Sequence, residues 1–455
     1  MNSLKSRTHY RIATERIVLA VACAIVFLAF GATAHAGPKN VIVMISDGCG
    51  YNHVDAASLY EYGRTGTQAY ESFPVVLAMS TYAFGQGYDP RMAWESFDYV
   101  SNGATDSAAS GTALATGTKT YNGAIGMDVD KSTLTNAVEV AEAAGRATGV
   151  VTSVQFAHAT PAAFSVHHPS RNDYEQIARK MIYGSALDVI MGCGHPLYND
   201  SGREDSQGYQ YVGGKKAWED LSDGKAKGAD ADGDGQPDTW TVVFDREEFA
   251  ALMAGPAPKR VLGIPKRNRT LQQKRKGDTK VGPFEVPFVE NAPTLAEMTR
   301  AAINVLDEDP NGFFLMVEGG AVDWAGHSNQ SGRVVEEEVA FNRAVDAVLR
   351  WIAVNSNWRD TLLIVTGDHE TGYMTGPGSG TVNGEPVWND VKSPGAGVQP
   401  EMQWHSGGHT NSLIPFYAKG RGANLFKRAA DHKDPVRGRY IDNTDVGAIV
   451  KRLLR

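Results

Sequence analysis

Cysteine is scarce in this chain: only three of the 455 residues are cysteines. One of them, Cys23, lies in an apolar N-terminal stretch that we expect to be removed, so the remaining chain can form at most one disulfide. Cys49 and Cys193 could pair in an oxidising compartment, but pairing needs a matched geometry that the sequence does not supply. Because Cys49 stands close to Asp47 in a glycine-rich turn, we interpret it as a small buried thiol.

Long apolar runs are also absent after the N-terminus. No segment beyond residue 36 approaches the roughly 20 apolar residues that a transmembrane helix needs. Residues 1–36 have the pattern of a secretory signal, with basic residues, an apolar stretch at 17–30 and an A-x-A cleavage pattern at 34–36. We therefore predict a signal peptide over 1–36 and a periplasmic or secreted protein without a membrane anchor; an uncleaved anchor is the alternative.

Positive charge is in deficit once the signal is removed. The remaining chain has 40 Lys and Arg residues against 51 Asp and Glu residues, a formal charge of −11. Such a chain does not hold nucleic acid by bulk electrostatics. A basic cluster exists but lacks interleaved aromatics and a recognisable binding motif, so we interpret it as a solvated or dimer-contacting surface. Its members are Lys259, Arg260, Lys266, Arg267, Arg269, Lys274, Arg275 and Lys276.

No fixed-period repeat is present, which excludes a solenoid or propeller. Instead, short apolar runs rich in branched residues alternate with segments whose apolar residues recur at helical spacing. The runs predict strands over 41–45, 149–152, 313–317 and 362–365. The spacing predicts helices over 133–144, 174–183, 294–306 and 334–352. This alternation predicts an α/β fold with a doubly wound, mostly parallel central sheet sandwiched by helices.

Two polar segments interrupt the alternation. Residues 199–240 are rich in Gly and Asp, and residues 376–400 are rich in Gly and Pro, so we predict surface insertions in one domain spanning 37–455. Within the first, residues 230–238 match the start of a calcium loop, but Thr241 stands where the bidentate acid is needed. A structural Ca2+ ion and a plain solvated turn both remain open.

Metal-ligand side chains follow three of the predicted strands. Asp47, Glu318 and the pair Asp368-His369 each stand at, or within three residues of, the end of an apolar run. In an open α/β sheet, loops at the carboxyl ends of parallel strands converge on one crevice, so ligands distant in sequence can meet there. The sequence therefore predicts a polynuclear metal site.

Three further ligand arguments rest on spacing. Asp323 and His327 are four residues apart, so on a helical turn they face the same side and can bind one ion. A surface ion pair is the alternative, but the small residues around them leave room for a metal. His409 would complete that site. Asp368 and His369 are adjacent and can share a metal only where their strand ends, because neighbouring strand residues point to opposite faces.

A candidate nucleophile precedes a run of small residues. In Asn102-Gly-Ala-Thr-Asp-Ser-Ala-Ala-Ser110, the hydroxyl of Ser107 could lie at a helix N-terminus facing a metal. Metal coordination lowers the pKa of a hydroxyl and makes it nucleophilic near neutral pH. A helix N-cap is the structural alternative. Because no G-x-S-x-G motif is present, an acyl-transfer hydrolase is disfavoured.

Taken together, these segments resemble alkaline phosphatases of the bacterial type. The resemblance runs from Asp47 to His409 in the family's order and covers nearly the whole mature chain. Its most specific segments are Thr105-Asp-Ser-Ala-Ala-Ser110, His158-Ala-Thr-Pro-Ala-Ala163 followed by Ser170-Arg171, Val317-Glu-Gly-Gly320 with Asp323 and His327, and Thr366-Gly-Asp-His369.

The resemblance implies a hydrolase of small phosphate monoesters that acts through a phosphoserine on Ser107. Arg171 would hold two phosphate oxygens with its planar guanidinium. The implied cofactors are two Zn2+ ions and one Mg2+ ion per subunit. The first zinc would be held by Asp323, His327 and His409, the second by Asp47, Asp368 and His369, and the magnesium by Asp47, Thr160 and Glu318, with His158 beside it. A homodimer is possible, since many members are dimers and some are monomers.

Two positions depart from the pattern of many members, which carry Asp in place of His158 and Lys in place of Trp324. We hypothesise that product phosphate is held more loosely and that activity depends more strongly on added magnesium. Other members pair His and Trp at these positions.

Two alternative functions remain. A phosphodiesterase or sulfatase on the same fold is the first, although residues 107–111 do not form the C/S-x-P-x-R signature that a sulfatase needs. The second is a secreted phosphate- or metal-binding protein without turnover. Hydrolysis of a nitrophenyl monoester but not its diester would distinguish the three.

Overall fold

The computed structural model describes residues 37–230 and 235–455. The predicted signal peptide, residues 1–36, lies outside the described residues, as do residues 231–234 of the candidate calcium loop. Residues Gly37–Arg455 form one compact unit.

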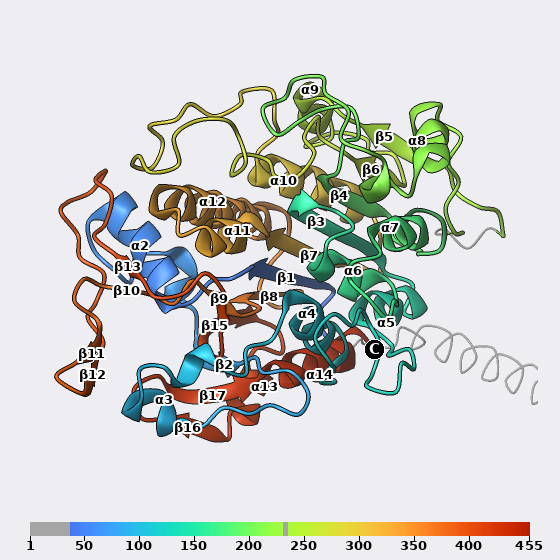
Figure 1. Cartoon of the computed structure of the whole chain (residues 1–455). Coiled ribbons are helices and arrows are strands. Elements are labelled where there is room, and N and C mark those ends of the chain that lie inside the picture. The colour runs from blue at the N-terminus through green and yellow to red at the C-terminus, as the bar shows by residue number, and fades with distance from the viewer. Residues whose placement is uncertain (1–36, 231–234) are drawn as a thin grey trace, which may run out of the picture. The chain divides into compact units, whose positions relative to one another are not determined.

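A sheet of eleven strands crosses the described part of the chain, in the order β16-β17-β2-β15-β8-β1-β7-β3-β4-β6-β5 (Figure 1). Every neighbouring pair from β8 to β5 is parallel, whereas β15 is antiparallel to both of its neighbours. The strands are β1 (Asn40–Ser46), β2 (Val75–Ser80), β3 (Ala147–Gln155), β4 (Val189–Cys193), β5 (Thr241–Val243), β6 (Val261–Gly263), β7 (Phe313–Gly319), β8 (Thr361–Gly367), β15 (Ile414–Gly420), β16 (His432–Asp434) and β17 (Gly438–Asp442).

The central strands are buried on both faces, and this explains their unbroken apolar runs. In β1, Val41, Val43 and Ile45 belong to one hydrophobic cluster, and the alternate residues Ile42 and Met44 belong to another. Each strand residue therefore contributes to one of two cores, on opposite faces of the sheet.

Helices cover both faces, which completes the sandwich. Residues of α10 and α12 pack in the core that contains Ile42, and residues of α5, α7 and α14 pack in the core that contains Val41. The α-helices are α2 (Tyr51–Tyr62), α3 (Met92–Glu95), α4 (Ser107–Thr116), α5 (Ala137–Ala143), α6 (Ala159–Ser165), α7 (Tyr174–Tyr183), α8 (Lys215–Ser222), α9 (Arg246–Ala251), α10 (Leu295–Leu306), α11 (Ala321–His327), α12 (Ser331–Asn355), α13 (Asn424–Ala429) and α14 (Asn443–Leu454). Short two- and three-residue strands form small separate sheets: β9 (Glu370–Thr371), β10 (Met374–Thr375), β11 (Gly380–Val382), β12 (Glu385–Val387), β13 (Gln403–Trp404) and β14 (His409–Thr410).

The predicted fold class is confirmed: the sheet is mostly parallel and helices lie on both of its faces. The four predicted strands correspond to β1, β3, β7 and β8, and the helix predicted over 174–183 coincides with α7. The antiparallel strand β15 was not predicted. It contains Pro415, which weakens a strand signal because proline cannot donate to the ladder.

The two predicted insertions differ in how they pack. In 199–240, the side chains of Trp218, Leu221 and Trp240 join the core, so this segment contains a packed helix, α8, as well as exposed loops. The segment 376–400 contains the hairpin β11–β12, whose residues are mostly exposed. Whether either segment is an insertion relative to other chains stays a prediction.

The solvated interpretation of the basic cluster is wrong for three of its arginines. Arg260, Arg267 and Arg275 are only 1%, 0% and 3% exposed. Arg260 donates hydrogen bonds to the backbone carbonyls of Leu187 and Ser185 and stacks on the ring of Trp240 at 4.0 Å. These arginines stabilise loops by satisfying buried carbonyls, a role that the local sequence did not reveal.

Cys49 and Cys193 are both buried and free, so they do not form a disulfide. Burial raises the pKa of each thiol well above its usual value. The interpretation of Cys49 as a buried thiol is confirmed, and both side chains contribute to the same apolar core.

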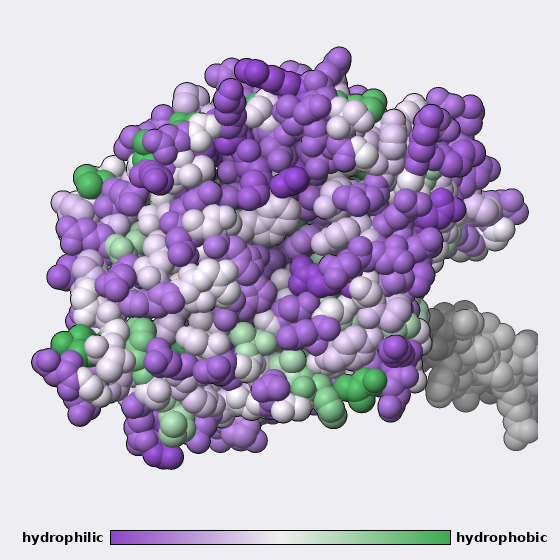
Figure 2. All heavy atoms as spheres, viewed as in Figure 1, coloured by the Kyte–Doolittle hydropathy of each residue, from purple (hydrophilic) through white to green (hydrophobic). Residues whose placement is uncertain are grey.

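The surface fits the polar composition of the chain. The face seen in Figure 2 is largely hydrophilic, with small apolar patches scattered over it. Among the described residues, no helix is both long enough and apolar enough to span a bilayer.

Candidate active site

The ligands converge because three adjacent parallel strands end at the same level. Ser46, the last residue of β1, pairs with Gly319 of β7 on one side and Gly367 of β8 on the other. The turn after β1 carries Asp47, and the turn after β8 carries the pair 368–369. Helix α11 directly follows β7 and presents Asp323 and His327 at the same edge. The predicted crevice at the carboxyl ends of the strands is therefore present.

Asp323, His327 and His409 form a first ligand cluster, with one candidate ligand atom from each lying within 4.8 Å of the others. Oδ1 of Asp323 lies 3.4 Å from Nε2 of His327 and 3.3 Å from Nε2 of His409. The other ring nitrogens are already held: Nδ1 of His327 lies 2.7 Å from the carbonyl of Gly407, and Nδ1 of His409 lies 2.8 Å from that of Thr105. These contacts orient both Nε2 atoms toward the cluster, as metal-binding histidines require.

A second cluster lies beside the first and shares Asp323 with it. Candidate ligand atoms of Asp47, Asp323 and His369 lie within 4.8 Å of one another. Nε2 of His369 is 3.5 Å from Oδ1 of Asp47 and 3.2 Å from Oδ2 of Asp368. The set predicted for a second metal, Asp47, Asp368 and His369, is therefore brought together, and Asp323 stands between the two clusters.

A third set consists of oxygen atoms that lack partners. Both carboxylate oxygens of Asp47, Oγ1 of Thr160 and Oε1 of Glu318 are buried and have no hydrogen-bond partner within the described residues. The Thr160 hydroxyl lies close enough to Glu318 to lower its pKa, yet makes no hydrogen bond of normal geometry. Orphaned buried oxygens need an explanation, and oxygen donors from three residues fit magnesium.

The electrostatics of these carboxyls also favour bound cations. Burial, reinforced by the charges of Asp368, Asp323 and Glu318, raises the pKa of Asp47 well above its usual value. Burial raises the pKa of Glu318 to about 7 and that of Asp368 to about 6. Buried carboxylates that repel each other are stable only when neutralised by protons or by cations.

Asp323 and His409 behave differently because they bind each other. Burial by itself raises the pKa of Asp323, but the hydrogen bond and charge of His409 outweigh it and hold that pKa well below its usual range. Burial lowers the pKa of His409, but Asp323 outweighs this effect and raises it to about 9. In the absence of an ion, a proton on His409 neutralises Asp323, and a metal ion can replace that proton.

Ser107 is the first residue of α4 and is only 1% exposed. The N-cap of this helix is Asp106, whose side chain accepts a hydrogen bond from the amide of Ala109 at 2.9 Å. The N-cap alternative for Ser107 is therefore wrong, because Asp106 satisfies the helix terminus. The Ser107 hydroxyl instead lies 3.2 Å from Nε2 of His369, beside the second ligand cluster.

Arg171 is anchored beside the same helix terminus. Its guanidinium donates to Oδ2 of Asp106 at 3.1 Å and lies 3.5 Å from Nε2 of His158. Burial lowers the pKa of Arg171, but the charge of Asp106 outweighs it and raises the pKa overall. Asp106 therefore has two functions, capping α4 and positioning the arginine. Asp106 was not among the predicted site residues, although an Asp preceding a run of helix-forming residues is a recognisable capping signal.

Some of these side chains line one pocket of about 280 Å3. The ring of His158 meets the edge of Trp324, with centroids 5.5 Å apart, and burial together with Arg171 lowers the pKa of His158 to about 3. No described residue of 199–240 lines this pocket. The remaining lining residues are Ser107, Arg171, Lys274, Asp323, His327, Ser328 and His409.

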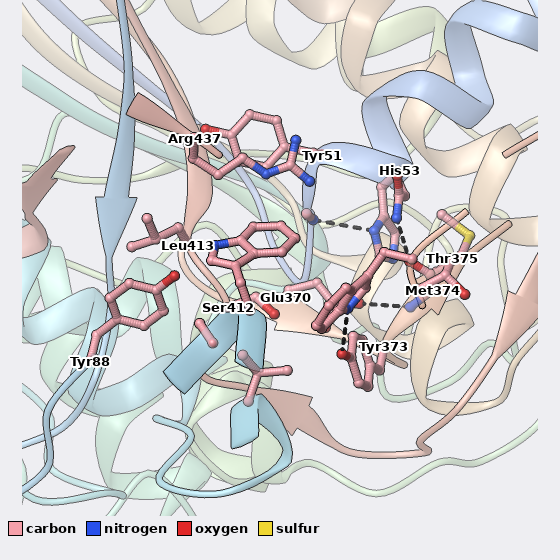
Figure 3. Close-up of a pocket in the computed structure, with 16 residues that line it drawn as sticks. Tyr51, His53, Tyr88, Glu370, Tyr373, Met374, Thr375, Ser412, Leu413 and Arg437 are labelled. Atoms are coloured by element: carbon pink, nitrogen blue, oxygen red, sulfur yellow. Dashed lines mark hydrogen bonds between the residues drawn. The ribbon is translucent and has the colours of Figure 1, made fainter. Parts of the chain in front are cut away.

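A second, smaller pocket of about 70 Å3 is lined by residues of α2, β9 and β10, among others, and shares no lining residue with the first. Its walls include the aromatic rings of Tyr51, Tyr88, Trp94, Tyr373 and Trp388. Figure 3 shows Arg437 lying over the ring of Tyr51, 3.9 Å from its centroid. Glu370 at its base is already satisfied, accepting hydrogen bonds from the amide of Met374 at 3.1 Å and the hydroxyl of Thr410 at 2.5 Å. Residues of β9 and β10 form part of the wall of this pocket, and none of the predicted catalytic residues lines it.

Comparison with known proteins gives consistent matches along the chain. A family model of alkaline phosphatases matches residues 38–396, a range that contains every predicted site residue except His409. Alkaline phosphatase 4 of Bacillus subtilis (strain 168) is 28% identical over 481 residues, which cover 92% of this chain and 89% of that protein. The alkaline phosphatase of Escherichia coli (strain K12) is 31% identical over 344 residues, covering 73% of this chain and 70% of that protein.

Solved structures agree with these relatives. The cold-active alkaline phosphatase of a psychrophilic Shewanella superposes with a TM-score of 0.66 at 25% identity, covering 91% of this chain and 100% of the other. A His-to-Asp mutant of TAB5 alkaline phosphatase, with Mg bound in its M3 site, superposes with a TM-score of 0.62 at 25% identity, covering 92% and 98%.

Proposed function

This chain belongs to the alkaline phosphatase family, and on that premise we propose that it is a secreted phosphomonoesterase acting through a phosphoserine on Ser107. The observation that carries the proposal is the position of the Ser107 hydroxyl. It lies at the N-terminus of α4, 3.2 Å from His369, and lines the same pocket as Arg171 and the first ligand cluster. A nucleophile, an anion-binding guanidinium and metal ligands in one pocket are the groups that phosphoryl transfer requires.

The donor sets fit two zinc ions and one magnesium ion. Mixed imidazole and carboxylate clusters suit zinc, and the partnerless oxygens of Asp47, Thr160 and Glu318 suit magnesium. The zinc ligands would be Asp323, His327 and His409 at one site and Asp47, Asp368 and His369 at the other. When bound, such metals act as Lewis acids that lower the pKa of a hydroxyl and stabilise negative charge that develops on oxygen.

The reaction then consists of two successive displacements at phosphorus. The Ser107 hydroxyl gives its proton to water, and its oxygen attacks phosphorus to form a phosphoserine. The ester bond breaks in the same step, and the departing alcohol oxygen takes up a proton from water. Arg171 donates hydrogen bonds to two phosphoryl oxygens and keeps the group oriented, with Asp106 holding the guanidinium in place. Water then attacks the phosphoserine from the opposite side, breaks the bond between serine oxygen and phosphorus, and releases inorganic phosphate.

The substrate class follows from the site residues, and the location follows from the predicted signal peptide. The proposed groups all hold the phosphoryl unit and leave the alcohol without defined contacts, so small phosphate monoesters of many alcohols should be accepted. The predicted signal over residues 1–36 would direct the enzyme to the periplasm or the medium. A homodimer and a structural Ca2+ ion near residue 230 stay predictions.

We further propose that His158 weakens the binding of magnesium in the site and that Trp324 weakens the binding of phosphate. Imidazole is a weaker partner than carboxylate for magnesium or its bound water, so His158 should make activity depend more on added magnesium. A His-to-Asp mutant of the related TAB5 enzyme has Mg bound in its M3 site, which supports this interpretation. Trp324 adds no charge to the pocket wall, and a Trp324→Lys variant should be inhibited by phosphate at lower concentrations.

The decisive experiment measures hydrolysis of nitrophenyl phosphate and of its bis(nitrophenyl) diester at pH 8 to 10, with metal content determined by mass spectrometry. Wild type should hydrolyse the monoester, and Ser107→Ala should retain its metals while losing activity by roughly 10³-fold or more. Ser328→Ala is the matched control, because it removes another serine hydroxyl from the same pocket. Preference for the diester would point to a phosphodiesterase, and binding of phosphate without turnover to a binding protein.

A further inference from the structure

Lys274 lines the Ser107 pocket from the segment between β6 and α10, which contains none of the residues assigned to the reaction above. Its Nζ lies 5.8 Å from the ring centroid of Trp324. Within the described residues, its ammonium makes no ion pair and no hydrogen bond. An unpaired ammonium in the wall of a catalytic pocket is available to a ligand.

The backbone around Lys274 is fixed, which distinguishes it from a surface lysine. On one side, Nε2 of Gln273 donates to Oε1 of Gln330 at 2.9 Å, three residues beyond α11. On the other side, the buried Arg275 binds Glu336 of α12 through two hydrogen bonds of 2.9 Å. The amide of Lys274 itself donates to Oγ1 of Thr270 at 2.8 Å. Gln273 and Arg275 therefore fix the backbone at Lys274 against the end of α11, which carries Asp323 and His327, and against α12, which follows it.

The charges of the pocket identify what Lys274 can bind. Arg171 is already paired with Asp106, so much of its charge is balanced within the protein. Among the described residues that line the pocket, Lys274 is the one lysine or arginine without an acidic partner. A phosphate monoester or inorganic phosphate carries about two negative charges at alkaline pH, since its second pKa is about 6. One paired and one unpaired cation in a single pocket suit such a dianion.

We propose that Lys274 is a phosphate-binding residue, whose ammonium binds an oxygen of the phosphoryl group, and of the released phosphate, from the Trp324 side of the pocket. The proposal rests on the proposed phosphomonoesterase function and adds a residue to it. It assigns the segment around residues 270–276 a direct part in substrate affinity, in addition to its packing role.

The test measures binding and turnover separately. Inorganic phosphate is titrated calorimetrically into the metal-loaded Ser107→Ala protein with and without Lys274→Gln. The neutral side chain should weaken phosphate binding about five- to tenfold, as expected for loss of one charged hydrogen bond at a partly exposed position. In the catalytically intact background, KM for nitrophenyl phosphate and the inhibition constant of phosphate should rise by similar factors. The difference should shrink as ionic strength increases, because salt screens exposed charges.

Matched variants make the result specific. Lys276→Gln removes an exposed lysine two residues along the same segment, one that does not line the pocket, and should leave phosphate affinity unchanged. Lys274→Arg keeps a cation and should retain most of the affinity.

The inference is overturned if Lys274→Gln and Lys276→Gln bind phosphate equally well in a wild type that hydrolyses the monoester. It is also overturned if the loss appears only with a bisphosphate substrate, since Lys274 would then bind a second anionic group. Failure of wild type to hydrolyse any monoester, together with Lys274-dependent phosphate binding, would overturn the proposed function and leave the phosphate site standing.

Discussion

Buried carboxylates occur in two regions of this molecule with opposite surroundings. At the ends of β1, β7 and β8, the carboxyls of Asp47, Glu318 and Asp368 are fully buried. Within the described residues they have no ion pair with lysine or arginine. In the first turns of α12, Glu336 is also buried, but it accepts two hydrogen bonds of 2.9 Å from Arg275 and one of 3.2 Å from Arg333.

The difference separates acids that stabilise the fold from acids reserved for a ligand. Glu336 is neutralised inside the protein, so its burial needs nothing from solution. The strand-end acids keep unused oxygens and raise one another's pKa values, so they destabilise the chain until protons or metal ions arrive. Arg171 lies in the same site but is paired with Asp106, and we infer that the strand-end acids lack an arginine partner for a functional reason, because a paired guanidinium would occupy the place of a metal.

Among the changes that distinguish the two regions, removal of the bound metals should have the largest effect. Chelation is expected to abolish monoester hydrolysis by roughly 10³-fold or more and to lower the unfolding temperature, because bound metals stabilise only the folded state. Calorimetry of the chelated and the zinc- and magnesium-reloaded protein at pH 8 measures the stability effect, and nitrophenol release from the same samples measures the activity. An unchanged unfolding temperature after complete metal loss would show that the strand-end acids do not depend on cations.

Removal of the arginine in the second region should affect stability without affecting metals. Arg275→Met leaves Glu336 buried with a weaker partner, and breaking such a pair typically costs about 3–5 kcal/mol of unfolding free energy. Denaturant unfolding measures the loss, and metal content should stay at the wild-type value. The double variant Arg275→Met/Glu336→Met is the control and should recover much of the stability. Loss of metal in Arg275→Met would contradict the independence of the two regions.

The first region could be predicted from the sequence and the second could not. Asp47, Glu318 and Asp368 stand out because each directly follows, or nearly follows, an apolar run, and strand ends in a parallel sheet must meet. Arg275 stands among seven other basic residues, and its burial depends on Glu336, 61 positions away in the chain. Local pattern cannot identify a partner at that distance, so the cluster was wrongly interpreted as a solvated surface.

Within the site itself, prediction had the same limit. Spacing suggested a shared ligand role for Asp323 and His327, and the structure brings their ligand atoms together. Thr160 and Arg171 were named only through the family resemblance, because a lone threonine or arginine carries no local signal. Asp106 was missed: its capping of α4 could have been recognised from the sequence, but its contact with Arg171 becomes visible only in three dimensions.

Glu337 provides a third case, a buried acid with neither an arginine of its own nor a metal role. Its Oε1 has no hydrogen-bond partner within the described residues, and burial, reinforced by the charge of Glu336, raises its pKa to about 8. An acid whose pKa is raised on folding costs stability as pH rises above its unfolded pKa of about 4.3, and the cost is complete above the folded value. Glu337→Gln cannot ionise, so near pH 5 it should be more stable than wild type by only about 1 kcal/mol.

At pH 9 the same variant should be more stable than wild type by up to about 5 kcal/mol, since a rise in pKa from about 4.3 to about 8 spans nearly four units of about 1.4 kcal/mol each. Unfolding in denaturant at the two pH values measures the difference. A gain that is equal at pH 5 and pH 9 would mean that Glu337 does not titrate between them, and that its protonation is not the source of the effect.

The smallest expected effect comes from adding an acid to the first region, the strand ends of β1, β7 and β8. His158→Asp places a carboxylate beside the proposed magnesium ligands, where oxygen is preferred over imidazole nitrogen. We expect magnesium affinity to rise about tenfold, equivalent to about 1.4 kcal/mol, and activation by added magnesium to become correspondingly weaker. Titrating magnesium into chelated enzyme that has been reloaded with zinc measures the affinity.

His158→Asn is the control for this last variant, because it supplies an uncharged oxygen and should gain much less magnesium affinity. If both variants gain equally, removal of the imidazole rather than the new charge is responsible, and the region does not select magnesium by its acids. The introduced carboxylate could instead pair with Arg171, whose guanidinium lies 3.5 Å from Nε2 of His158. Phosphate affinity would then fall, because the new acid would neutralise Arg171. Magnesium affinity would stay the same, because the new acid would not contribute to binding the metal.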